Sequence, residues 1–99
     1  MSDRPLFAAG RLMLTPGAIN KLREANERAQ EFFARHLAGD WGEVSADVCR
    51  GNDEAIAKGE LLFSSYRLCT GECIYITTEA DRSSTTMLLS KEYHDGNRA

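Results

Sequence analysis

A histidine, an aspartate and a tryptophan lie close together in the middle of the chain, and their side chains suit acid–base chemistry or ligand binding. His36 and Asp40 are four residues apart, and Trp41 follows directly. His36 can act as a general base near neutral pH, with Asp40 as its partner or as a second group holding a ligand. Trp41 would be an aromatic platform beside the pair. The structural alternative, which we favour, places His36 at a helix C-terminus and Trp41 at the edge of the core.

A second group of charged residues, Glu79, Asp81 and Arg82, lies within one predicted turn. In a functional interpretation, Arg82 grips a phosphate or a carboxylate, and Glu79 or Asp81 serves as a base or holds a metal. In the structural alternative, Asp81 accepts hydrogen bonds from nearby backbone N–H groups, and Arg82 pairs with a carboxylate. A metal site would need further ligands at a readable spacing, and the sequence offers none. We therefore expect neither a metal nor a cofactor.

Two tyrosines and an arginine on adjacent predicted strands raise the question of nucleic-acid binding. Tyr66, Arg67 and Tyr75 would form an aromatic and basic sheet face like that of single-strand binders. The net charge of −3 and the lack of clustered lysine and arginine argue against nucleic acid or an anionic membrane as a partner. Cross-strand packing is therefore our interpretation of these side chains.

The three cysteines indicate a reducing compartment. Their number is odd, and Cys69 and Cys73 flank a turn without the two further nearby ligands that a zinc site needs. The N-terminus lacks the apolar core of a secretory signal, and no apolar run approaches the length of a membrane span. We therefore expect a cytoplasmic protein with reduced thiols.

The stretch from Glu60 to Leu89 predicts three consecutive strands. Its residues are largely β-branched or aromatic, and Gly71 in the first of two short polar connections favours a hairpin. Ile74 and Ile76 share one face of their strand, which we expect to pack on helices, whereas the face of Tyr75 is expected to be more solvated. The predicted strands are 61–68, 73–78 and 85–89, with turns at 69–72 and 79–83.

The N-terminal half predicts one further strand followed by helices. Gly10 in the predicted strand suggests a bulge or a close approach of backbone, and Thr15 followed by Pro16 is typical of a helix start. Apolar spacing alone allows either one helix or two before Gly39. The predicted elements are a strand over 6–14, helical sequence over 16–38, a helix or two short turns over 45–58, and a single turn over 90–93.

These elements predict an α+β fold in a single domain. The chain has 99 residues, 42% of them hydrophobic and 27% charged, which is typical of one globular domain. We expect a three- or four-stranded, mostly antiparallel sheet with the N-terminal helices on one face, and flexible ends at 1–5 and 94–99. Strand 6–14 belongs either at an edge or beside the central hairpin.

Several segments resemble a family of small bacterial proteins found with plasmids and integrated mobile elements. The strongest are His-x-x-Gly-Asp-Trp-Gly, at 36–42, and Glu-Ala-Asp-Arg-Ser, at 79–83, within a resemblance that runs from about Leu12 to Tyr93. In that family the region of Asn26 to Ala29 looks like a Gly-x-Ser-Pro break between two helices. The resemblance therefore implies helices at about 16–26 and 28–38, although this chain has neither that glycine nor that proline. It implies no activity.

The sequence contains no complete catalytic set, so we expect a non-enzymatic, protein-binding accessory module. The resemblance implies that the module belongs to a bacterial mobile element. The predicted binding residues are Asp40, Trp41, Tyr66 and Arg82. The alternative is a small hydrolase or nuclease-like enzyme that uses His36, Glu79 and Asp81 with Arg82 and requires these groups to converge in one cleft. The sequence gives no indication of the oligomeric state.

Overall fold

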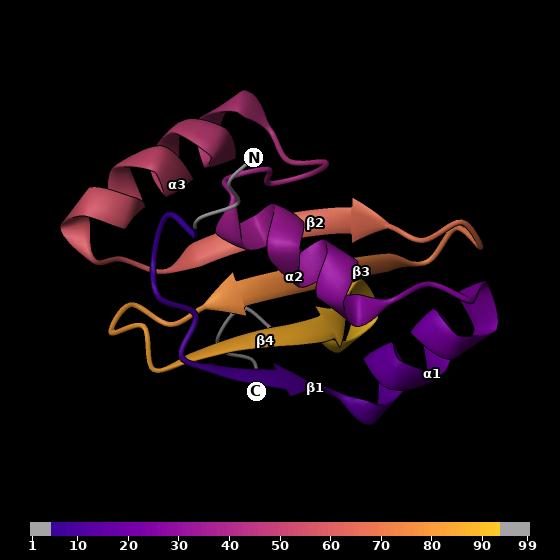
Figure 1. The fold of residues 1–99 in the computed structure, drawn as a ribbon. Helices are drawn as coiled ribbons and strands as arrows, with labels where there is room; N and C mark the ends of the chain where they lie inside the picture. The colour runs from indigo at the N-terminus through magenta and orange to yellow at the C-terminus, as the bar shows by residue number, and fades with distance from the viewer. Residues whose placement is uncertain (1–4, 94–99) are drawn as a thin grey trace.

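Four strands form one mixed sheet in a computed structural model that describes residues 5–93 (Figure 1). The strands are β1 (Arg11–Leu14), β2 (Leu62–Arg67), β3 (Cys73–Thr78) and β4 (Ser84–Leu89). Their order across the sheet is β1-β4-β3-β2. β2, β3 and β4 form the predicted antiparallel meander, whereas β1 joins the sheet parallel to β4. The predicted α+β class is confirmed, and strand β1 lies at an edge.

The N-terminal strand is shorter than predicted, because only residues 11–14 of the expected 6–14 pair in the sheet. Gly10 lies just before the first residue of the strand and has a φ of +67°. A side chain at this position would come within 2.4 Å of the carbonyl oxygen of Arg82. The predicted close approach of backbone at Gly10 is therefore confirmed. Before Gly10 the chain crosses to the helices, where the Leu6 N–H donates to the Leu37 carbonyl oxygen at 2.8 Å.

Three helices accompany the sheet: α1 (Pro16–Ala25), α2 (Ala29–Leu37) and α3 (Ala46–Lys58). The two-helix interpretation of 16–38 is confirmed, and α3 is one helix rather than two short turns. Asn26 ends α1 in the left-handed conformation with a φ of +58°. Asparagine tolerates that conformation better than most residues, so the helical segment is interrupted here although the chain has neither a glycine nor a proline at this point.

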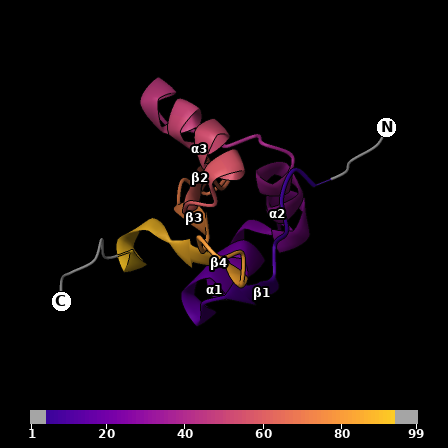
Figure 2. The ribbon, with the colours of Figure 1, turned by 90° about the vertical axis from the view of Figure 1, so that its left-hand side faces the viewer.

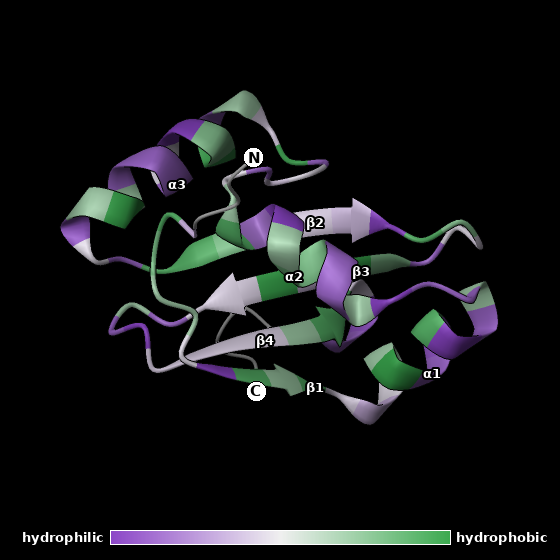
Figure 3. Cartoon of the chain, in the orientation of Figure 1, coloured by the Kyte–Doolittle hydropathy of each residue, from purple (hydrophilic) through white to green (hydrophobic). Residues whose placement is uncertain are grey.

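The helices cover one face of the sheet. Figure 2 shows α2 on one side of the strands and the C-terminal turn η1 (Ser90–Glu92) on the other. Ile74 and Ile76 are fully buried on the helix side, as predicted, in a core with Leu22 of α1 and Phe33 of α2. Hydrophilic and hydrophobic residues alternate around the helices in Figure 3, as amphipathic cover for a sheet requires.

The opposite face carries a cluster of three aromatic rings. Phe63, Tyr75 and Tyr93 contact one another edge to face, with centroids 4.7 to 5.8 Å apart. Tyr93 reaches the sheet because η1 follows β4 directly, which confirms the predicted turn near 90–93. Neither predicted flexible end can be assessed as a whole, since 1–4 and 94–99 lie outside the described residues.

The β2 edge of the sheet is covered by two other segments. Along it, the Ser65 N–H donates to the Trp41 carbonyl oxygen at 3.0 Å, and the Glu43 N–H donates to the Ser65 carbonyl oxygen at 2.6 Å. Two residues earlier on β2, the Asn52 side chain of α3 donates to the Phe63 carbonyl oxygen at 2.7 Å and accepts from the Phe63 N–H at 3.1 Å. The Asn52 amide thus takes the place of a neighbouring strand.

No helix between residues 5 and 93 combines the length and the apolar character needed to cross a membrane.

Candidate functional site

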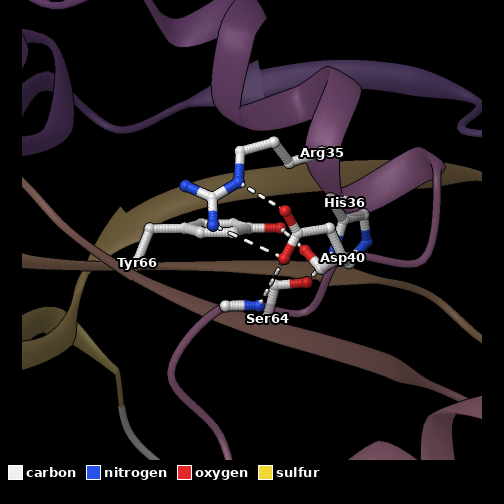
Figure 4. A network of polar contacts seen from close by, with 6 residues as sticks. Arg35, His36, Asp40, Ser64 and Tyr66 are labelled. Atoms are coloured by element: carbon white, nitrogen blue, oxygen red, sulfur yellow. Dashed lines mark hydrogen bonds and ion pairs between the residues drawn. The ribbon is translucent and has the colours of Figure 1, made fainter.

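His36 lies at the centre of a buried polar network, close to the end of α2. Its side chain is fully buried, with Nδ1 2.5 Å from Ser64 Oγ and Nε2 2.9 Å from Thr78 Oγ1 (Figure 4 shows the Ser64 side). Ser64 on β2 and Thr78 on β3 face the helices because side chains alternate along a strand. The sheet therefore presents two hydroxyl groups to one imidazole ring.

The donor and the acceptor of each hydrogen bond in this network can be assigned by starting from Thr85, which lies at its far end. Thr85 Oγ1 donates to the Ala9 carbonyl oxygen at 2.8 Å, so it must accept from Thr78 Oγ1, which lies 2.8 Å away. Thr78 has then used its proton and accepts from His36 Nε2–H. Nδ1 carries no proton in the neutral ring and accepts from Ser64 Oγ–H. His36 is thus a neutral imidazole protonated at Nε2, with both nitrogens engaged.

Aromatic rings separate His36 from solvent. Phe7 and Trp41 meet the imidazole edge to face at 5.4 and 5.5 Å. Burial lowers the pKa of His36 from 6.5 to about 4, because the charged ring would lose its hydration. The Trp41 side chain is itself only 4% exposed, and its Nε1 donates to Asp53 Oδ1 at 3.3 Å. The expectation of Trp41 as a surface platform is therefore wrong, and its ring fills the core as in the structural alternative.

Asp40 points away from His36 and pairs with Arg35. Arg35 Nε donates to Asp40 Oδ2 at 2.8 Å, and this bond holds the pKa of the Asp40 carboxyl below its usual value. The Arg35 guanidinium also lies over the ring of Tyr66, 4.6 Å from its centroid (Figure 4). The His36–Asp40 pair of the functional interpretation is not formed, whereas Asp40 and Arg35 make a half-exposed ion pair beside the Tyr66 ring.

Tyr66 is buried on the helix side of β2 and does not offer a binding surface. Its hydroxyl donates to the Asp40 carbonyl oxygen at 2.5 Å, and burial raises its pKa to about 12. Tyr75 and Arg67 lie on the opposite face, because Tyr66 is the register partner of Ile74. The shared face of Tyr66, Arg67 and Tyr75 that single-strand binding would require is therefore not formed.

The glycines of the His-x-x-Gly-Asp-Trp-Gly segment explain its shape. Gly42 has a φ of +77°, and a side chain there would lie 2.0 Å from the Ser65 carbonyl oxygen. Gly39 also has a positive φ and follows Ala38, the residue that caps the end of α2. The segment is thus a tight corner that takes the chain from the end of α2 to the β2 edge.

Arg82 directs its guanidinium to main-chain carbonyl groups. Its Nη atoms donate to the carbonyl oxygens of Ala55 at 2.9 Å, Glu60 at 2.7 Å and Glu79 at 3.1 Å. These acceptors include a carbonyl in the last turn of α3, where a cation also meets the negative end of the helix dipole. Arg82 therefore joins the end of α3 to the 79–82 turn, and the carboxylate partner of the structural alternative is replaced by these carbonyls.

The acidic residues of the same turn do not meet His36. Asp81 Oδ1 accepts from the Ser83 N–H at 2.9 Å, which matches the structural alternative. The Ser83 side chain, and after it the Ser83 N–H, lower the pKa of the Asp81 carboxyl. Glu79 is exposed, and its N–H closes the turn to the Ser84 carbonyl oxygen. Since both His36 nitrogens bond to hydroxyl groups, neither acid forms an acid–base pair with this histidine.

Replacing Arg82 by alanine is expected to lower the free energy of unfolding by about 2 kcal/mol, because the variant loses several charge-assisted hydrogen bonds. Chemical denaturation measures the change. Arg23→Ala on the exposed side of α1 is the matched control, with an expected change within about 0.5 kcal/mol. Equal stability of Arg82→Ala and the control would contradict this structural role.

The buried hydroxyl groups were not identified as site residues from the sequence. Ser64, Thr78 and Thr85 occupy inward positions among apolar neighbours on their strands, and that placement is the signal for a polar network. Asn52, inside α3, gave no such signal. Within residues 5–93 no group of three or more His, Cys, Asp or Glu side chains is arranged to hold a metal, and Cys49, Cys69 and Cys73 are unpaired.

No protein-family model matches the chain, and neither a curated protein nor a solved structure is significantly similar to it.

Proposed function

We propose that this protein is a non-enzymatic, cytoplasmic module that binds another protein chain through the β1 edge of its sheet. The observation that carries the proposal is the difference between the two edges. Trp41, Glu43 and Asn52 cover the β2 edge, whereas β1 has a strand on one side only within residues 5–93. An open strand edge is a template for pairing with another chain.

The side chains of β1 support this use of the edge. Leu12 is 50% exposed and Met13 is 44% exposed, one on each face of the strand. Large apolar side chains beside unpaired backbone groups favour association over solvation. The resemblance of residues 36–42 and 79–83 to proteins of plasmids and integrated elements supports a place for the module in a bacterial mobile element.

Two of the groups that the enzyme alternative needs, His36 and Arg82, are engaged in bonds within the fold. His36 is neutral and fully buried, and the guanidinium of Arg82 bonds to carbonyl groups. A general base must reach the proton that it removes, directly or through one water. Their arrangement therefore favours the binding module over a hydrolase or nuclease.

Photo-crosslinking in cells tests the proposal. A photoreactive phenylalanine derivative at Met13 should capture a protein chain, whereas the same group at Leu61, 47% exposed beside the β2 edge, should not. The two positions are similarly exposed and apolar, so the comparison isolates the β1 edge. Absence of any protein adduct at Met13, with the variant folded, would overturn the proposed function.

A further inference from the structure

The outer edge of β1 offers backbone groups from two residues. β1 pairs with β4 in the register Arg11 to Ser84 and Met13 to Thr86, and the Arg11 N–H donates to the Ser83 carbonyl oxygen at 3.0 Å. In a parallel ladder alternate residues bond to a given neighbour. The N–H and C=O groups of Leu12 and Leu14 therefore point away from the sheet, at the lower edge in Figure 1.

This edge is self-complementary under a two-fold axis at Met13. An antiparallel copy of β1 would place Leu12 opposite Leu14 of the copy, and Leu14 opposite Leu12. Both are then hydrogen-bonded pairs and use all the outward groups of the strand. Met13 would face Met13 of the copy as a non-hydrogen-bonded pair, in which side chains approach most closely.

The charges at the ends of the strand complement each other in the same arrangement. Arg11 would lie opposite Thr15 of the copy, on the same face of the sheet. The Thr15 hydroxyl donates to Glu92 Oε1 at 2.7 Å, so the Glu92 carboxylate stands beside that position. Arg11 is exposed and has no ion-pair partner among residues 5–93. Two-fold symmetry would create two Arg11–Glu92 pairs between the copies.

Gly17 leaves space for the Glu92 carboxylate, which Thr15 and Leu89 hold by hydrogen bonds. A side chain at Gly17 would lie 2.5 Å from Glu92 Oε2, and the other carboxylate oxygen also accepts from the Leu89 N–H at 2.9 Å. The carboxylate is thus held by the end of β4 and the start of α1, close to the end of β1. A fixed charge costs less conformational entropy on association than a mobile one.

We propose that the partner at the β1 edge is a second copy of this chain, joined by antiparallel β1–β1 pairing into one continuous eight-stranded sheet. The proposal rests on the proposed function and names its partner. A strand of four residues supplies a small contact, so the dimer should be weak and dependent on concentration. A homodimer built in this way has an isologous interface.

Sedimentation equilibrium of the full chain, from about 1 µM to about 1 mM, should show the average mass rising from one chain toward two. Met13→Lys places two like charges against each other at the axis and should weaken dimerisation at least tenfold. Arg11→Glu should also weaken it, because it sets an acid beside Glu92 of the copy. Leu61→Lys is the matched control and should dimerise as the native protein does. A constant mass of one chain, or equal dimerisation of Met13→Lys and Leu61→Lys, would overturn the proposal.

A disulfide tests the register directly. In a background with Cys49, Cys69 and Cys73 replaced by serine, Met13→Cys should form a symmetric disulfide under mild oxidation, because Cα atoms of a non-hydrogen-bonded pair lie about 4.5 Å apart. Leu61→Cys should form no disulfide between copies under the same conditions. No disulfide at position 13 would contradict this register. Photo-crosslinking at Met13 separates the two proposals: capture of a different protein alone overturns the homodimer and retains the binding module, whereas no capture removes both.

Discussion

Acidification from pH 6.5 to pH 4 is expected to lower the free energy of unfolding by roughly 3 kcal/mol through His36 alone, since one pKa unit corresponds to about 1.4 kcal/mol. Folded His36 stays neutral down to a pKa of about 4, whereas the same residue in the unfolded chain takes up a proton below 6.5. Protons in this window therefore bind preferentially to the unfolded state. The stabilisation is fully present above pH 6.5 and is lost as the pH falls toward 4.

Urea denaturation at several pH values measures this loss. His36→Gln lacks the titrating ring, so it should be less stable at pH 7 but should show no decline between pH 6.5 and 4. His94, the other histidine of the chain, provides the control, and His94→Gln should keep the native decline. The pKa values of Asp40 and Asp81 are lowered from 3.8, so these carboxyls affect stability at more acidic pH. An undiminished slope in His36→Gln would contradict the neutral, buried imidazole.

Asn52→Leu should cost about 3 kcal/mol of folding stability, although leucine has a similar volume and suits a helix. Asn52 is 4% exposed and both donates to and accepts from the main chain of Phe63. Leucine would leave the N–H and C=O of Phe63 buried without partners, and each such group costs about 1–3 kcal/mol. The comparison variant is Asn20→Leu on the exposed face of α1, where we expect a change within about 0.5 kcal/mol.

Amide hydrogen exchange adds a local measurement to the Asn52 experiment. The Phe63 N–H should lose protection in Asn52→Leu well beyond the general loss of stability, because only the Asn52 oxygen accepts from it at this edge. The Ser65 N–H, bonded to the Trp41 carbonyl oxygen, should follow the general loss. Unchanged relative protection of Phe63 would mean that Asn52 does not close this edge.

The meander could be predicted from the sequence because its pairing is local. The alternation of apolar and polar side chains around Ile74 and Ile76 predicted both the strand and its buried face. Gly71, with a φ of +99°, allows the tight turn of the hairpin. The parallel position of β1 could not be derived in the same way. It depends on the close approach of Gly10 to the backbone of Arg82 and Ser83, which are more than seventy residues away along the chain.

The candidate site was only partly predictable for a similar reason. Side-chain type indicates what Arg82 and Trp41 can do, but it does not indicate that α3 supplies Ala55 as an acceptor for Arg82 and Asp53 as an acceptor for Trp41. Alternation places Thr78 on the face of Ile74 and Ile76, but only the fold shows that Thr78 and Thr85 share a chain of hydrogen bonds with His36. The type of a side chain therefore predicts which bonds it can form, but it does not predict where the side chain lies or which groups it contacts.

The pairing of β1 with β4 has a consequence for folding order. Arg11 in β1, the first strand along the chain, pairs with Ser84 in β4, the last strand. Pairing of these two strands therefore closes a loop that contains all three helices and the other two strands. Closing so long a loop is entropically costly and slow until the intervening segments are compact. During synthesis on the ribosome β1 emerges first and is fixed last. We therefore expect the hairpin of β2 and β3 to acquire native structure before the N-terminal strand docks.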